Sequence, residues 1–124
     1  MNSEIPKTMN GETEKNTGSA PIQQILDNAV QRILSVVKPQ RIILFGSVAR
    51  GEIGPDSDLD FLVVMPNGTH RRKTSVEILR ALRGIGMPKD VIVATEQDLT
   101  TYGNNASLIL KPALAEGKDL YASA

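Results

Sequence analysis

Apolar residues recur at helical and strand spacings from residue 21 onward and are nearly absent before it. Residues 1–20 are rich in Asn, Glu, Lys, Thr, Ser and Gly and carry almost no large apolar side chains. Such a segment cannot bury enough surface to offset the entropy that it loses on ordering. We therefore expect a disordered tail over residues 1–20 and one folded domain over residues 21–124.

The folded domain is predicted to begin with an amphipathic helix. Its apolar residues recur at steps of three and four, which places them in one stripe along a helix. They are Ile22, Ile25, Leu26, Ala29, Val30, Ile33, Leu34 and Val37. Pro21 suits a helix start, and Pro39 prevents the helix from continuing past Val37. The pattern predicts a helix over residues 21–37.

Three short runs rich in Ile, Leu and Val predict three buried strands, over residues 41–45, 59–64 and 90–94. Gly46 stops the first strand, and a Met-Pro-Asn-Gly sequence stops the second. Between the strands and after them, helical segments are predicted over residues 47–50, 69–84, 95–102 and 105–116, with Gly117 as the last stop. The order indicates an α/β domain of the α+β type, in which helices pack on a small, mixed sheet of three or four strands.

Composition narrows the class of protein further. The 124 residues fit one domain, and 40% of them are hydrophobic, but there are only two Tyr, two Phe and no Trp. Fourteen basic and fourteen acidic residues give a net charge of zero, which argues against a dedicated nucleic-acid surface. The absence of Cys excludes disulfides and thiolate chemistry. With no signal peptide and no apolar run of membrane length, we expect a soluble cytoplasmic protein.

Two carboxylates at the start of the second strand are candidates for metal binding. Asp58 and Asp60 stand two positions apart, so strand alternation would place both on one face. Neighbouring carboxylates repel unless a cation lies between them, and oxygen ligands suit Mg²⁺ or Mn²⁺. The crossover through residues 69–84 would make the second and third strands parallel, so that Asp90 joins the same acidic cluster.

The turn before these carboxylates has the composition of a phosphate site. Gly46 would let a phosphate approach the backbone, and Ser47 would offer a hydroxyl beside the free N–H groups of a helical turn. A return of about ten residues would make the first and second strands antiparallel neighbours. Arg50 has two interpretations: its guanidinium could bind phosphate, or it could be a solvated helix residue.

Two further charged features of the sequence are better explained as ordinary surface residues than as parts of a binding site. Asp56 lies beside Gly54 and Pro55, which favours a turn residue over a metal ligand. The basic cluster of residues 70–73 could bind nucleic acid or a partner protein, but a solvated loop and first helical turn explain it more simply.

Taken together, these residues resemble the signature of the DNA polymerase β-like nucleotidyltransferase superfamily. The closest resemblance is to the minimal nucleotidyltransferases, or MNT proteins. It lies in Leu44-Phe45-Gly46-Ser47-Val48-Ala49-Arg50-Gly51, in Ser57-Asp58-Leu59-Asp60, in Asp90 and in the closing stretch from Ala113 to Tyr121. The resemblance covers residues 21–124.

The resemblance implies a metal-dependent transfer reaction. Gly46 and Ser47 would hold the triphosphate of ATP, and Asp58 and Asp60 would hold two Mg²⁺ ions. Asp90 would bind the second metal and help to activate the attacking hydroxyl. Attack at the α-phosphate would transfer AMP and release pyrophosphate, with two metals stabilising the attacking and leaving oxygens.

The resemblance also implies a partner. MNT proteins resemble the antitoxin half of two-gene modules whose other half is a helical HEPN ribonuclease, and the acceptor there is a tyrosine of the toxin. A HEPN-type toxin or a homo-oligomer is thus the expected partner. Two other interpretations stay open: a non-catalytic antitoxin subunit that masks a partner protein, and a modifier of small molecules. Relatives that modify small molecules usually carry an additional domain.

Overall fold

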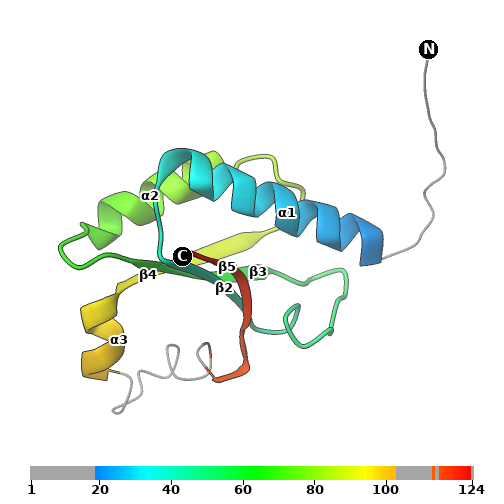
Figure 1. Cartoon of the computed structure of the whole chain (residues 1–124). Helices are drawn as coiled ribbons and strands as arrows, with labels where there is room; N and C mark the ends of the chain where they lie inside the picture. Colours follow the sequence, from blue (N-terminus) through cyan, green and yellow to red (C-terminus); the bar gives the residue numbers. More distant parts are fainter. Residues whose placement is uncertain (1–18, 103–112, 114, 124) are drawn as a thin grey trace.

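The computed structural model describes residues 19–102, 113 and 115–123 (Figure 1). The elements in chain order are α1 (Ser19–Val36), β2 (Arg41–Phe45), β3 (Leu59–Met65), α2 (Arg71–Ala81), β4 (Lys89–Thr95), α3 (Glu96–Tyr102) and β5 (Lys118–Ala122). Residues 1–18 of the predicted tail lie outside the described residues. So does most of the predicted helix over residues 105–116, although 113, 115 and 116 are helical.

The four strands form one mixed sheet in the order β4-β3-β2-β5. β2 and β3 are antiparallel, and β3 and β4 are parallel across the α2 connection, as the sequence predicts. β5 pairs antiparallel with the other side of β2 and was not predicted. The sheet therefore places β2 and β3, which flank the Gly-Ser turn, at its centre.

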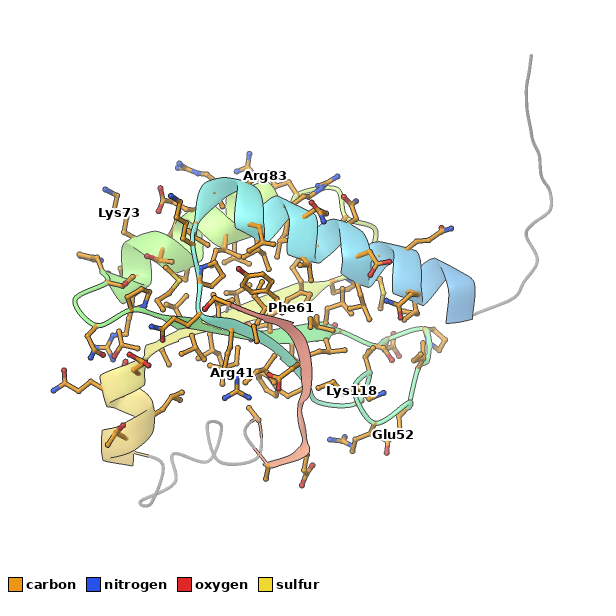
Figure 2. All side chains as sticks on the ribbon, in the orientation of Figure 1. Arg41, Glu52, Phe61, Lys73, Arg83 and Lys118 are labelled. Atoms are coloured by element: carbon orange, nitrogen blue, oxygen red, sulfur yellow. The ribbon has the colours of Figure 1, made fainter. Side chains whose placement is uncertain are left out.

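The larger core lies between the sheet and the helices α1 and α2, which cover the same face (Figure 1). Alternate residues of β3 point into this core, where Phe61 packs beneath α1 (Figure 2). Its fully buried members include Ala29, Ile33, Ile42, Leu59, Phe61, Val63, Ile78 and Leu82. The apolar stripe predicted for the first helix is thus the surface that α1 buries against the sheet.

A smaller core covers the opposite face of the sheet. It contains Ile43, Leu62, Val64, Ala94 and Ala113, with Phe45, Ile92 and Leu99 packed against it. Because side chains alternate along a strand, Asp60 lies on the face of Leu62 and Val64, and Asp90 on the face of Ile92 and Ala94. Both carboxylates therefore belong to this second face, at the end of the sheet where β3 and β4 begin.

Helix α2 is shorter than the predicted range of residues 69–84. His70 is its N-cap, and its Nδ1 accepts a hydrogen bond from the Lys73 N–H at 3.2 Å. Thr69 belongs to the preceding turn, since its hydroxyl donates to the Pro66 carbonyl. At the other end the helix stops at Ala81, before the positive-φ residue Gly84. Among helices in the described ranges, none is both long and apolar enough to cross a membrane.

Candidate active site

The chain turns sharply after β2, and the turn is anchored in the core. Val48 and Ala49 are both buried, at 5% exposure each, within the larger cluster. The Arg50 N–H donates to the carbonyls of Gly46 and Ser47, which closes one turn of helix-like backbone. The predicted helical turn over residues 47–50 is therefore present as a single hydrogen-bonded turn.

The first N–H groups of this turn take no part in the hydrogen bonding of the sheet. Within the described residues, no backbone carbonyl accepts a hydrogen bond from the N–H groups of Ser47, Val48 or Ala49. The first N–H groups of any helical turn are unpaired in this way, and they attract anions. The half-buried Ser47 also borders a wide-open surface hollow with loop residues Gly51 to Ser57, and none of the three carboxylates lines this hollow. The Ser47 hydroxyl and these backbone N–H groups are the donors that the turn offers to a phosphate.

Strand pairing brings Asp60 to the centre of the candidate site. In the sheet register Asp60 is opposite Phe45 on one side and opposite Asp90 on the other. Phe45 is the residue immediately before Gly46, so the carboxylate of Asp60 lies beside the start of the turn. The sequence expectation that the second and third strands begin side by side is thereby met.

Gly46 is required by this close approach. Its φ is +81°, in the left-handed region that L side chains rarely adopt. A Cβ built on Gly46 would also overlap the Asp60 carboxylate, with Oδ2 as the nearest atom. Glycine is therefore needed at position 46 for two reasons. It can adopt the backbone conformation of the turn, and it leaves room for a carboxylate beside the backbone.

The other two carboxylates flank Asp60 and are exposed. Asp58 stands one residue before β3, so only Asp60 of the pair lies within the strand. Asp90 lies in β4, and one of its oxygens accepts a hydrogen bond from the Val91 N–H at 3.0 Å. Burial raises the pKa of Asp60, and the negative charges of Asp58 and Asp90 raise it further. The three predicted residues thus act on one another electrostatically.

These carboxylates fit a divalent cation by chemistry. Oxygen ligands are what Mg²⁺ and Mn²⁺ prefer, and mutual repulsion among the three is relieved by a cation. In residues 19–102, 113 and 115–123, no group of three or more His, Cys, Asp or Glu side chains is close enough to enclose an ion. Asp58 and Asp90 are exposed, whereas Asp60 is half-buried.

Arg50 points toward the loop that follows the turn. Its Nε and Nη2 donate to the two carboxylate oxygens of Glu52 at 3.3 and 3.2 Å. Glu52 raises the pKa of the Arg50 guanidinium through this contact. Of the two interpretations of Arg50, the structure therefore shows an exposed residue held in an ion pair on the rim of the site.

The basic cluster of residues 70–73 lies away from the carboxylates. It follows the end of β3 at Met65, whereas Asp60 stands near the start of that strand. At roughly 3.3 Å per residue, five positions correspond to about 17 Å. Arg71 pairs with Asp98 at 2.9 Å, and this contact contributes to a lowered pKa of Asp98, whose largest cause is the hydrogen bond from the Thr95 N–H. Lys73 extends from α2 away from the sheet (Figure 2).

Two residues of the intervening loop have contacts for which sequence reasoning gave no role. Glu52 holds Arg50, and the Ser57 hydroxyl bonds within the loop directly before Asp58. The sequence carries one signal for Ser57, its place in the Ser57-Asp58-Leu59-Asp60 string. Their contacts are formed between loop residues and follow no periodic pattern.

Two solved structures share this fold. A proposed minimal nucleotidyltransferase is 23% identical, with a TM-score of 0.60 over 86% of this chain and 100% of that one. A proposed nucleotidyltransferase from Sulfolobus solfataricus is 19% identical, with a TM-score of 0.55 over 88% of this chain and 93% of that one. The likeness shows the mixed four-stranded α+β fold.

A weaker likeness is to a chain in a complex of a tri-AMPylated Shewanella oneidensis HEPN toxin with an MNT antitoxin. It is 21% identical, with a TM-score of 0.49 over 82% of this chain and 72% of that one. Among curated proteins, none matches the sequence. Residues 24–112, which contain the Gly-Ser turn and all three carboxylates, match the model of the nucleotidyltransferase domain. The chain belongs to the nucleotidyltransferase domain family.

Proposed function

We propose that this protein transfers AMP from ATP to a hydroxyl on a partner protein, in a reaction that requires Mg²⁺. The observation that carries the proposal is the position of Asp60, which lies beside Gly46 and opposite Asp90. This arrangement joins a turn suited to phosphate with a cluster of carboxylates suited to a metal. A nucleotidyl transfer needs both, because a triphosphate must be held and its charge neutralised.

The turn would hold the phosphates of ATP. The N–H groups of Ser47 and its neighbours offer donors, and the Ser47 hydroxyl adds another. Arg50 would contribute only if it left Glu52, since both oxygens of that carboxylate now accept from its guanidinium.

The carboxylates would bind the metal ions and orient the acceptor hydroxyl. Asp58, Asp60 and Asp90 are the expected ligands, and two bound divalent cations would stabilise the attacking and leaving oxygens. Asp90 would in addition orient the acceptor hydroxyl, because it is exposed at the edge strand of the sheet. Most of the rate enhancement would come from positioning and charge neutralisation.

The acceptor is proposed to be a tyrosine of a HEPN-type toxin, with this chain as the antitoxin. The support is the MNT-like sequence of the Gly-Ser turn, of Ser57 to Asp60 and of the closing stretch from Ala113 to Tyr121. A domain with one small sheet leaves little surface for gripping an acceptor of its own. A partner protein would supply that half of the site.

The test is a transfer assay with two labels. The full chain is incubated with Mg²⁺ and ATP labelled at the α- or the γ-phosphate, with the product of the neighbouring gene as the candidate acceptor. We expect α-label on a tyrosine of the partner and no γ-label, because AMP transfer retains only the α-phosphate. Asp58→Asn and Asp60→Asn should each lower transfer by at least about a hundredfold, the magnitude typical for loss of one stabilising group.

Asp56→Asn is the matched control, because it removes an exposed carboxylate from the same loop. It should transfer like the wild type. The proposal would be overturned by transfer that persists in Asp58→Asn and Asp60→Asn. It would equally be overturned by a wild-type protein that silences the partner without binding ATP, which is the behaviour of a non-catalytic masking subunit.

A further inference from the structure

The loop between the Gly-Ser turn and the first carboxylate has one residue that is turned inward. Residues 51–56 are all exposed, and so is Asp58, whereas Ser57 between them is half-buried. The loop contains Gly51 and Gly54, which add backbone freedom and no side-chain packing. Order in this loop therefore depends on its hydrogen bonds.

Three of those hydrogen bonds involve Ser57. Its hydroxyl accepts from the Gly54 N–H at 2.7 Å and donates to the Glu52 carbonyl at 3.3 Å. Its own N–H donates to the Gly54 carbonyl at 3.1 Å. One hydroxyl thus ties two separate points of the loop to the residue that precedes Asp58.

A further hydrogen bond links this loop to the Gly-Ser turn, where phosphate is expected to bind. The Glu52 N–H donates to the Ser47 carbonyl at 2.9 Å. A continuous path of hydrogen bonds and single peptide links therefore runs from Ser47 through Glu52 and Ser57 to Asp58. Its two ends are the residue expected to bind phosphate and the first residue expected to bind metal.

We propose that Ser57 is a positioning residue, whose hydroxyl fixes Asp58 relative to the Gly-Ser turn. The inference rests on the proposed function for the roles of Ser47 and Asp58. Ser57 itself reaches neither phosphate nor metal in this scheme. It acts by restricting the loop, so that the carboxylate of Asp58 is held where the reacting phosphate will lie.

The architecture predicts which kinetic constant depends on Ser57. The Gly-Ser turn is anchored independently, through Val48 and Ala49 in the core. Loss of the Ser57 hydroxyl should therefore leave ATP binding largely intact and misplace Asp58. In Ser57→Ala, kcat should fall by roughly tenfold to a hundredfold, since small misplacements of reacting groups have effects of that size. The KM for ATP should change by less than about twofold, because it reports uniform binding.

Two variants serve as controls. Ser57→Thr keeps the hydroxyl and should restore most of kcat. Ser75→Ala removes a half-buried serine hydroxyl from α2, where it donates to the Arg72 carbonyl at 2.9 Å, and should leave both constants unchanged. A general loss of stability would lower activity in both alanine variants, whereas a positioning role affects only Ser57→Ala.

A readout without catalysis separates this inference from the proposed function. Amide hydrogen exchange of Gly54 in the full chain should accelerate about tenfold or more in Ser57→Ala and stay slow in Ser57→Thr. If the wild type transfers AMP while Ser57→Ala keeps its kcat, the positioning role is wrong and the function stands. If no protein transfers AMP, the proposed function fails. In that case unchanged Gly54 exchange in Ser57→Ala would refute the loop tie as well.

Discussion

At the scale of single residues, the site depends on what is missing at one position. Gly46 has no side chain, and the space that a Cβ would occupy is filled by the Asp60 carboxylate. From the sequence, Gly46 was expected to let a phosphate approach the backbone. The structure adds a second requirement, because a Cβ at this position would overlap the Asp60 carboxylate of the same chain.

Replacing Gly46 by Ala tests this requirement. We expect Gly46→Ala to push Asp60 out of place and to lower AMP transfer by at least about a hundredfold, the effect expected of a misplaced reacting group. The measurement is kcat at saturating Mg²⁺ and ATP, together with the urea midpoint of unfolding.

Gly51→Ala separates overlap from backbone strain. Gly51 has the same φ of +81°, but no atom lies within 4 Å of an added Cβ. It should lose about 1–2 kcal/mol of stability from the left-handed conformation alone and keep most of its transfer activity. Equal losses of activity in the two variants would show that strain, and not contact with Asp60, is what matters.

At the scale of elements, the strands that carry the site were predictable and the strand that supports them was not. β2, β3 and β4 each contain an apolar run of four or five residues, because β2 and β3 lie at the centre of the sheet and α2 and α3 pack against β4. β5 begins with Lys118 and Asp119 and is mostly exposed, so it shows neither an apolar run nor clean alternation. Its conformation comes from pairing with β2, which no local pattern reveals.

The proximity of the candidate residues could be predicted from sequence for a related reason. Gly46, Ser47, Asp58 and Asp60 are close in the chain, and one hairpin and one crossover are enough to bring Asp90 beside them. Hydrogen bonds such as those of Ser57 and Glu52 depend on how an irregular loop folds back on itself. Periodicity carries no information about them.

Gly117 shows how β5 is held, and it gives a prediction. A Cβ on Gly117 would overlap the Ala113 carbonyl and the Ile43 side chain and would lie 3.1 Å from the Leu44 carbonyl. We expect Gly117→Ala to push β5 away from β2 and to lower the free energy of unfolding by about 1–3 kcal/mol, as overpacking does. Urea denaturation followed by circular dichroism measures it.

Gly54→Ala is the matched variant for Gly117→Ala. Gly54 also has an ordinary φ, and an added Cβ there would meet nothing within 4 Å. It should unfold at the wild-type urea concentration. Coincident curves for the two variants would mean that Gly117 does not contact β2 in solution.

At the scale of the whole molecule, the fold separates the larger core from the carboxylates of the candidate site. The helices α1 and α2 cover one face of the sheet and bury the larger core (Figure 1). The three carboxylates lie at the start of β3 and β4, two of them on the opposite face and away from that core. Repulsion among them is consequently tolerated, although it lowers the stability of the chain when no cation is bound.

The burial of Asp60 and the repulsion from Asp58 and Asp90 together predict how stability depends on pH. The raised pKa of Asp60 means that the folded chain binds its proton more tightly than the unfolded chain does. Stability therefore falls as the pH rises through the window above about 3.9, the ordinary value for Asp. We expect Asp60→Asn to have a higher urea midpoint than the wild type at pH 7, and this gain to vanish near pH 3.

Mg²⁺ provides the second half of the same test. At pH 7 a cation bound by the carboxylates should raise the wild-type midpoint, since a ligand that binds only the folded state stabilises it. The rise should be absent in Asp60→Asn, which has lost a negative charge and a ligand, and present in Asp56→Asn. If Asp60→Asn gained no stability at pH 7, Asp60 would not be a destabilising carboxylate, and if Mg²⁺ stabilised this variant as much as the wild type, Asp60 would not be the metal ligand. In the second case a metal ion, if one binds, would be held by other residues than Asp60.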